Sequence, residues 1–195
     1  FNINQAVFRC DDCNEPLEVE MIRKGKIKES KFIFERYSEF LPFNQVDDYQ
    51  SLGEGLTPLV KIERFAKLLG VQNLYIKNES HNPTWSFKDR GTASGIIYAK
   101  KLGYKKVGTV STGNMAPSVA AYSASNGLDA YILVKGEMSD EKIAPIAIYK
   151  PKLIRVHGDY GELYYKSLDI GKANQICFIN SDAPMRIEGS KTIAF

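Results

Sequence analysis

The stretch NPTWSFKDRG, residues 82–91, places a lysine at the start of a predicted helix. Its proline disfavours helical geometry in the preceding residue, so we expect a turn there, and Ser86 can cap the helix that follows. Lys88 then lies in the first helical turn, where the positive helix end and partial burial disfavour the ammonium form and favour attack on an aldehyde. A surface lysine paired with a carboxylate is the commoner alternative. Arg90 is expected to pair with Asp89 or to lie on the surface.

A second motif, Ser111-Thr112-Gly113-Asn114, joins a predicted buried strand to a helix. Glycine permits backbone conformations closed to other residues, and free amides at a helix start, with two hydroxyl groups beside them, can hold a carboxylate. The Asn114 side chain can donate a hydrogen bond to a ring oxygen. An ordinary strand-to-helix turn capped by a hydroxyl group is the alternative. Nucleotide binding has little support, because the chain has neither a G-x-G-x-x-G motif nor a Walker lysine loop.

Short apolar runs alternate with helical patterns over most of the chain. The expected strands are 74–76, 107–110, 131–134, 153–156 and 176–179. The expected helices are 63–69, 86–102, 116–126, one that opens at Ser139, and 159–174. This alternation predicts an α/β fold with a parallel sheet, flanking helices and right-handed crossovers. Parallel sheets bind ligands at the carboxyl ends of their strands, and both motifs are expected there, since each directly follows a predicted strand.

The amino-terminal part differs in texture from the rest of the chain. Residues 1–48 are expected to form an N-terminal arm, and residues 49–195 a catalytic region. Two strands and a linker are expected within the arm, at residues 17–22, 31–35 and 41–48. Cys10 and Cys13 have the spacing of a zinc knuckle, but tetrahedral zinc needs four ligands and no second pair follows. We interpret the pair as half of a zinc ribbon, with a bound metal as the weaker alternative.

The composition, with 44% hydrophobic and 25% charged residues among 195, is that of an ordinary globular chain. A net charge of +3, spread over scattered lysines, argues against a nucleic-acid partner. No apolar run approaches the roughly 18 residues of a membrane span, and no signal peptide is visible, so no membrane partner is expected. The chain lacks an initiator Met, so we expect residues upstream. Three cysteines, with Cys177 in an apolar run, favour a reducing, cytoplasmic setting.

An ordered series of motifs resembles the threonine synthase family of fold-type II pyridoxal-phosphate enzymes, whose fold is similar to that of tryptophan synthase β. The series runs GEGLTPL (53–59), KNE (77–79), NPT through Gly91 (82–91), STGN (111–114), GDY (158–160), INS (179–181) and RIEGSKT (186–192). The lysine motif alone is a weak signal, but the ordered series is specific and covers nearly the whole chain. The Cys10–Cys13 spacing is also similar to a half-ribbon that many members carry.

The resemblance implies roles for individual residues. Lys88 would be the catalytic residue, which binds pyridoxal 5'-phosphate covalently and then moves protons, with Phe87 and Asn114 beside the cofactor. Ser111, Thr112 and Gly113 are implied to hold the substrate's carboxylate. The residues implied to hold its phosphate are Asn180, Ser181 and Arg186. A guanidinium suits a phosphate dianion, although the residues alone fit a helix-start surface cation at Arg186 equally well. The implied lyase converts O-phosphohomoserine and water to threonine and phosphate, and family members are often homodimers.

Three features depart from the family pattern. Trp85 stands where the family usually has glycine, so its ring is expected to narrow the pocket or cover the cofactor. Met115 stands where a hydroxyl residue is usual, so one carboxylate contact is expected to be lost. The family's cofactor-phosphate loop and the hydroxyl residue facing the pyridine nitrogen do not precede Phe195, so the resemblance is to the amino-terminal half. The alternatives are a serine/threonine dehydratase, a cysteate synthase-like enzyme and a truncated, non-catalytic paralogue.

Overall fold

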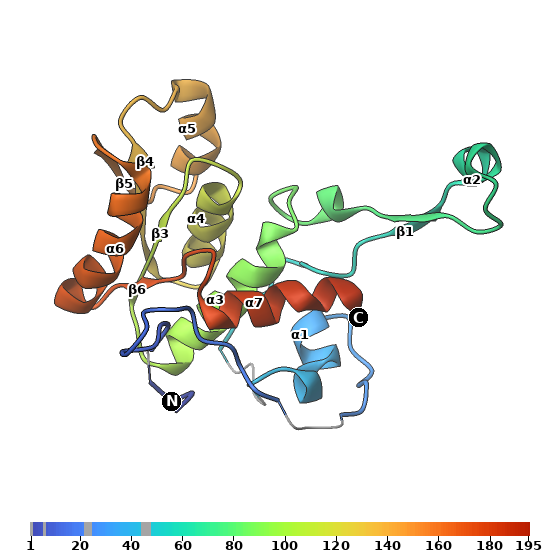
Figure 1. Cartoon of the computed structure of the whole chain (residues 1–195), viewed down its shortest axis with the longest axis horizontal. Coiled ribbons are helices and arrows are strands. Elements are labelled where there is room, and N and C mark those ends of the chain that lie inside the picture. Colours follow the sequence, from blue (N-terminus) through green and yellow to red (C-terminus); the bar gives the residue numbers. More distant parts are fainter. Residues whose placement is uncertain (1, 6, 22–24, 44–47) are drawn as a thin grey trace.

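The computed structural model describes residues 2–5, 7–21, 25–43 and 48–195, which form two sheets surrounded by helices (Figure 1). The strands are β1 (Leu59–Lys61), β2 (Tyr75–Lys77), β3 (Lys106–Val110), β4 (Asp129–Lys135), β5 (Lys152–Val156) and β6 (Cys177–Phe178). The helices are α1 (Ile33–Arg36), α2 (Glu63–Leu69), α3 (Lys88–Lys101), α4 (Met115–Ser125), α5 (Asp140–Ala147), α6 (Tyr160–Asn174) and α7 (Pro184–Ser190), with short 3-10 turns at Ser38–Phe40, Glu79–His81 and Lys191–Ala194. None of the helices in these ranges is long and apolar enough to cross a bilayer.

The main sheet is parallel, with the strand order β5-β4-β3-β6. Side chains alternate between its two faces, as strand geometry requires. Ala130, Ile132 and Val134 of β4 belong to the larger core cluster, whereas Leu133 joins Leu163 of α6 in a smaller one. Helix α4, backed by α3, therefore covers one face of the sheet, and α6 covers the other.

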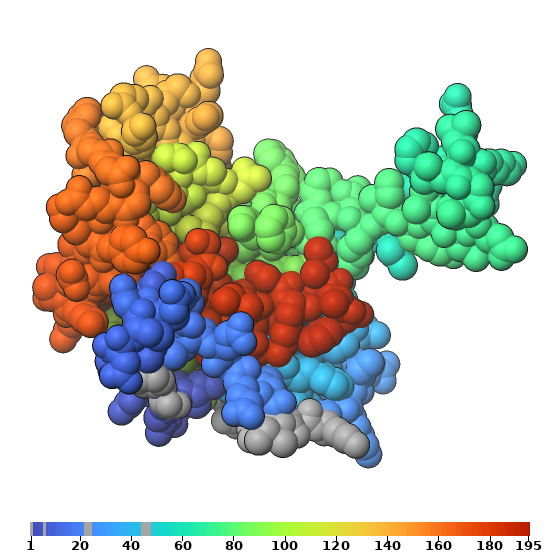
Figure 2. Space-filling model, viewed as in Figure 1, coloured from blue at the N-terminus to red at the C-terminus, as the bar shows by residue number. Residues whose placement is uncertain are grey.

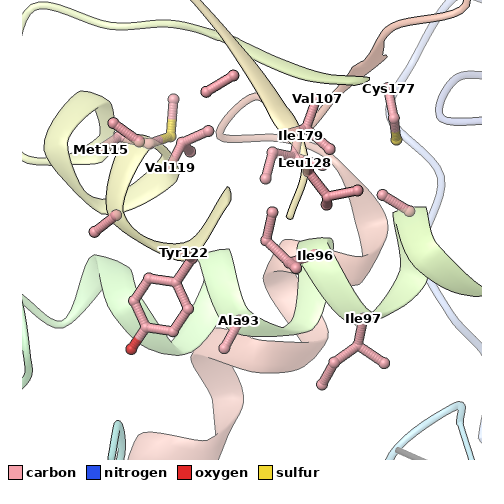
Figure 3. Packing of buried hydrophobic residues seen from close by; sticks show 14 of the residues in the cluster. Ala93, Ile96, Ile97, Val107, Met115, Val119, Tyr122, Leu128, Cys177 and Ile179 are labelled. Atoms are coloured by element: carbon pink, nitrogen blue, oxygen red, sulfur yellow. The ribbon is translucent and has the colours of Figure 1, made fainter. Parts of the chain in front are cut away.

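The larger core cluster holds α3 and α4 against the sheet (Figure 3). Ala93 and Ile96 of α3 and Val119 and Tyr122 of α4 are all fully or almost fully buried in it. Burial of a large apolar side chain such as that of Ile96 or Val119 stabilises a fold by roughly 1.5–3 kcal/mol. Because these contacts fix α3 on α4, they also fix the starts of both helices, where the two motifs lie.

The strand order reverses between β3 and β6, because β4 and β5 extend the sheet on one side of β3 and β6 returns to its other side. The Ile179 N–H donates to the Gly108 carbonyl at 2.9 Å, and the Val110 N–H donates to Oδ1 of Asn180 at 3.0 Å. The carboxyl ends of the two strands therefore lie side by side. Open parallel sheets bind ligands at such a switch point, where the strand order reverses. The 111–114 loop begins at this place, directly after β3.

The predicted α/β architecture is confirmed, and every expected strand of the parallel sheet is present except 74–76. That segment contributes β2, which pairs antiparallel with β1 in a separate two-stranded sheet. The expectation that the lysine turn follows a strand of the parallel sheet is therefore wrong. A short run of aromatic and β-branched residues favours a strand but does not specify its partner, and here all three residues of β2, Tyr75–Lys77, are exposed.

The structure also corrects two strands expected in the amino-terminal part. Residues 17–21 form no strand, and the pairing beside them is an isolated bridge between Arg9 and Pro16; Ile22 lies outside the described residues. The segment expected to return as a strand contains α1 instead. Ile33 and Phe34 are adjacent and both buried, which alternation along a strand does not allow. Of the expected linker, residues 44–47 also lie outside the described ranges.

Strands β1 and β2 and helix α2 form a second arm, distinct from the N-terminal arm expected for residues 1–48, and it stands clear of the rest of the molecule (Figures 1 and 2). Both strands are exposed along their length, and α2 buries only Ala66. Its exposed apolar side chains are Leu59, Val60, Phe65, Leu68, Leu69, Val71, Tyr75 and Ile76. A two-stranded ribbon has little stability of its own in water.

Helix α3, which begins with Lys88, packs closely against α7 (Figure 1). A Cβ on Gly91 would lie 2.9 Å from the Arg186 carbonyl oxygen, and a Cβ on Gly189 would overlap the Arg90 carbonyl. Glycine at both positions lets the two backbones approach to this distance. The close approach brings Arg186 next to the start of the lysine helix.

Candidate active site

Lys88 is the first residue of α3 and directly follows the loop of residues 82–87. The Ser86 hydroxyl accepts a hydrogen bond from the Lys88 backbone N–H at 3.2 Å, so it satisfies one of the free amides at the helix start. The Lys88 Nζ lies 4.5 Å from the centre of the exposed Phe87 ring. Within the described residues Lys88 forms no ion pair, so the carboxylate partner expected of an ordinary surface lysine is missing there.

The electrostatic surroundings of Lys88 favour its neutral form. Partial burial lowers the pKa of Lys88, and the positive charge of Arg186 lowers it further. A larger share of the amine is therefore neutral, and hence nucleophilic, than in a lysine surrounded by water. Arg186 is thus close enough to Lys88 for the two charges to interact.

Arg186 lies in the first turn of α7 and is 3% exposed, so its interpretation as a surface cation is wrong. Its Nη1 donates to Oγ1 of Thr92 at 3.0 Å, and no carboxylate of the described ranges forms an ion pair with it. Burial lowers the pKa of Arg186 to about 10, while the negative charge of Asp89 acts in the opposite direction. A buried guanidinium without a directly bonded counter-charge favours an incoming anion.

The 111–114 loop follows β3 and ends where α4 begins. Ser111 is buried, and its Oγ accepts a hydrogen bond from the Gly113 N–H at 3.2 Å, so one amide of the expected carboxylate cradle already has a partner. Thr112, Gly113 and Asn114 are exposed and accessible to a ligand. The loop therefore has the geometry of a hydroxyl-stabilised strand-to-helix turn, with its outer residues free of burial.

Asn180 and Ser181 follow β6 at the neighbouring strand end. Asn180 is buried, and its side chain bonds within the protein: Oδ1 accepts from the Val110 N–H, and Nδ2 donates to Oγ of Ser167 at 2.9 Å. Its amide therefore joins the ends of β3 and β6, a structural role that sequence reasoning did not assign to it. Ser181 is exposed.

The expectation for Arg90 is wrong, since it neither pairs with Asp89 nor lies on the surface. Arg90 is fully buried, and its guanidinium binds both carboxylate oxygens of Glu79 and the Gly55 carbonyl. Partial burial by itself raises the pKa of Glu79, but hydrogen bonds from Arg90, Thr57 and Asn82 outweigh that effect and lower it to about 2. The lysine helix is therefore anchored by a charged contact to the segments that precede it.

The two residues that depart from the family pattern differ in burial. Trp85 has a left-handed backbone with φ of 59°, a conformation that favours glycine, and it is 82% exposed. Met115 begins α4 and is buried in the larger core cluster, where Figure 3 shows it beside Val119. The backbone at position 85 thus gives a physical reason why glycine is usual there.

Cys10 and Cys13 are free thiols that lie close together. Hydrogen bonds from the Cys13 and Asp12 backbone amides, and one from the Cys13 thiol, lower the pKa of Cys10. No group of three or more histidine, cysteine or acidic side chains with the geometry of a metal site occurs in the described part of the chain. A hollow of about 440 Å³ beside Cys10, lined also by Cys177, does not include Lys88.

Sequence reasoning missed a cluster of buried polar side chains next to Lys88. Asp89 and Thr92 of α3 and Ser118 of α4 are all completely buried, and their oxygen atoms bond to one another. A signal was present, because Thr92 and Ser118 each interrupt a helical run of small and apolar residues. Polar side chains in such runs are hydrogen-bonded when they are buried, so they indicate a polar contact between helices.

The chain belongs to the pyridoxal-phosphate dependent enzyme family, whose sequence profile matches residues 50–195. Among curated proteins it is similar to the threonine synthase of Methanocaldococcus jannaschii, with 36% identity over 100% of this chain and 50% of that protein. It is 38% identical to the threonine synthase of Bacillus sp. (strain ULM1), over 85% of this chain and 47% of that protein. The resemblance to threonine synthases is confirmed, pyridoxal 5'-phosphate is the cofactor of the family, and the chain spans about half the length of the curated relatives it matches.

Solved structures confirm the fold that the motifs implied. The processed form of threonine deaminase isoform 2 from Solanum lycopersicum has a TM-score of 0.64 and 24% identity, covering 91% of this chain and 48% of that one. Apo diaminopropionate ammonia lyase from Escherichia coli has a TM-score of 0.62 and 20% identity, covering 74% of this chain and 47% of that one. At these identities the similarity shows a shared fold, the parallel sheet with flanking helices of fold-type II enzymes.

Proposed function

We propose that the chain carries the lysine-bearing part of a threonine synthase-like lyase, which converts O-phosphohomoserine and water to threonine and phosphate. One observation carries the proposal: the amine of Lys88, with a lowered pKa, lies near the buried guanidinium of Arg186, and neither is paired with a carboxylate of the described residues. A neutral amine suits an aldehyde, and a buried guanidinium suits a phosphate dianion. The similarity to threonine synthases supports the same substrate.

The residues at the site fit the cofactor, because an aldehyde requires an unpaired, partly neutral amine and Lys88 supplies one. Pyridoxal phosphate, when bound, supplies an electron sink for the electrons left on the substrate's α carbon. Lys88 Nζ accepts and returns protons at that carbon, which its lowered pKa favours. Phe87 and Asn114, whose side chains are exposed at the starts of α3 and α4, would contact the cofactor.

The substrate is held at both of its charged ends. Ser111, Thr112 and Gly113 bind its carboxylate, supported by the accessible outer residues of their loop. Arg186 binds its phosphate, with the second Nδ2 proton of Asn180 and the exposed Ser181 hydroxyl as further donors. A cation that stabilises the leaving phosphate in place lowers the barrier to its departure.

The burial of Arg186 favours this function over that of a dehydratase. A dehydratase for free serine or threonine has no phosphate to place against that guanidinium, which would then stay buried without a directly bonded counter-charge. A cysteate synthase-like enzyme with a phosphorylated substrate would use the same site, so the products must separate the two. A non-catalytic paralogue has no need of a lysine with a lowered pKa.

The purified protein, mixed with pyridoxal phosphate, tests the proposal. We expect a yellow protein that bleaches with borohydride, and peptide mass spectrometry should find the fixed label on Lys88. Lys88→Ala should lose the label, and Lys101→Ala, at the other end of the same helix, should keep it. Release of phosphate from O-phosphohomoserine, without oxobutyrate or pyruvate from threonine or serine, identifies the synthase. A label that is absent from Lys88 rejects the proposal.

A further inference from the structure

Asp89 is a buried carboxylate that holds the loop before Lys88. Its Oδ2 accepts a hydrogen bond from the Thr84 N–H at 2.7 Å, and its Oδ1 accepts one from the Thr84 hydroxyl at 2.5 Å. A third donor is the hydroxyl of Ser118 on α4, at 2.6 Å from Oδ1. Asp89 is completely buried, and these three hydrogen bonds from Thr84 and Ser118 fix the loop against α4.

The hydroxyl groups next to Asp89 form a chain whose direction can be deduced. The Ser118 hydroxyl has a single proton, and the carboxylate can only accept, so that proton is donated to Asp89. The oxygens of Ser118 and Thr92 are 2.8 Å apart, which leaves the Thr92 hydroxyl as the donor in that contact. Thr92 Oγ1 in turn accepts from Nη1 of Arg186 at 3.0 Å. The protons therefore all point from the guanidinium toward the carboxylate.

We propose that Asp89 is a positioning residue that orients Arg186. It acts through a relay of hydrogen bonds, which runs from Arg186 by way of the hydroxyls of Thr92 and Ser118 to the Asp89 carboxylate. The relay lets the carboxylate stabilise the buried guanidinium without binding it directly. Among the described residues, only one N–H of Arg186 is used by the relay, so the other donors of the fork stay available for an anion. The proposal rests on the function above, in which that anion is the substrate's phosphate.

The geometry explains why an indirect contact is useful here. A direct bidentate pair, like that between Arg90 and Glu79, occupies two edges of a guanidinium and satisfies its charge. Two hydroxyls between the charges keep them farther apart, which weakens their attraction. The guanidinium is then held in one orientation but retains a large part of its affinity for a dianion. Since Thr84 also bonds to Asp89, the same carboxylate places Arg186 and the lysine loop relative to each other.

A double-mutant cycle on unfolding tests the relay without any ligand. We expect Asp89→Asn and Arg186→Met to be coupled, with about a tenfold effect on the unfolding equilibrium constant beyond additivity. The coupling should vanish when the cycle is repeated in Thr92→Val and should return in Thr92→Ser, which restores the hydroxyl. Coupling that persists unchanged in Thr92→Val, or that is absent from the unmodified background, overturns the relay.

Binding of inorganic phosphate, measured by calorimetry, supplies a second readout that a merely structural role would not change. Ser118→Ala and Thr92→Val should each weaken phosphate binding by about tenfold. Ser123→Ala is the matched control, because this buried hydroxyl of α4 donates to the Val119 carbonyl of its own helix and, among the described residues, has no contact with the relay. Equal affinity in the relay variants and this control contradicts the relay. If the unmodified protein and Arg186→Met bind phosphate equally, the proposed anion site fails instead, and the unfolding cycle still decides the relay.

Discussion

Arg90 and Glu79 form a bidentate ion pair, with 2.7 Å between Nε and Oε2 and 2.8 Å between Nη2 and Oε1. The same guanidinium donates to the Gly55 carbonyl at 2.6 Å, and the Thr57 hydroxyl donates to Glu79 at 2.6 Å. The pair therefore joins three segments of the chain: the lysine helix, the turn at 79–81 and the loop that leads into β1. These contacts fix the first turn of the lysine helix against the residues that precede it.

The Arg90–Glu79 pair should be a major contributor to stability. Glu79→Gln leaves the fully buried guanidinium without its counter-charge, so we expect the free energy of unfolding to fall by about 3 kcal/mol. Urea denaturation measures this loss in the free energy of unfolding. Lys166→Ala is the control, since it breaks the exposed pair with Glu162 and should change the same quantity by less than about 1 kcal/mol. Equal effects of the two substitutions would show that the buried pair is replaceable.

Stability should also depend on Glu79 at acid pH. The folded pKa of Glu79 is about 2, below its ordinary value of 4.5, so the unfolded chain binds this proton more readily. The stabilisation is therefore complete above pH 4.5 and is lost as the pH falls toward 2. Urea midpoints measured across this window should fall more steeply in the unmodified protein than in Glu79→Gln. Parallel curves would show that other carboxyl groups dominate the acid response.

The backbone at Trp85 should be strained, because a non-glycine residue with a φ of 59° is costly. Trp85→Gly should raise the free energy of unfolding by about 0.5–1 kcal/mol, the relief of strain being partly offset by the larger entropy of glycine in the unfolded chain. Trp85→Ala separates backbone from side chain, since it keeps the strain and removes a ring that is mostly exposed. A large loss of stability in Trp85→Ala would show instead that the ring packs against the protein.

The charge of Arg186 should control the reactivity of Lys88. Arg186→Met removes a nearby cation, so the pKa of Lys88 should rise and less neutral amine should be present at neutral pH. Labelling by pyridoxal and borohydride, followed at the Lys88 peptide, should move to higher pH. Pyridoxal lacks the phosphate, so lost phosphate binding does not enter the result. An unchanged profile would mean that burial alone sets the pKa.

The repeated pattern of apolar runs was enough to predict the parallel sheet and its helices, since buried strands and amphipathic helices leave a strong local signal. The pattern failed at β2 and α1, where the partner of a segment, rather than its own sequence, decided the outcome. The same holds within the site. A lysine at a helix start is visible in the sequence, whereas the burial of Arg90 and Arg186 is not.

Contacts that join distant segments could not be derived from the sequence. The Asp89–Ser118 hydrogen bond links residues on two helices, and the Arg90–Thr192 hydrogen bond joins residues that are 102 positions apart in the sequence. Each depends on how closely the helices approach, which for α3 and α7 is set by Gly91 and Gly189. Single glycines indicate a close approach but do not name the neighbouring element.

The arm formed by β1, α2 and β2 has a practical consequence for anyone who handles this polypeptide by itself. Exposed strand edges and exposed apolar side chains on a thin projection are surfaces through which proteins associate with one another. Aggregation during purification, and the first cuts made by a protease, should therefore be governed by this projection, while the parallel sheet stays intact.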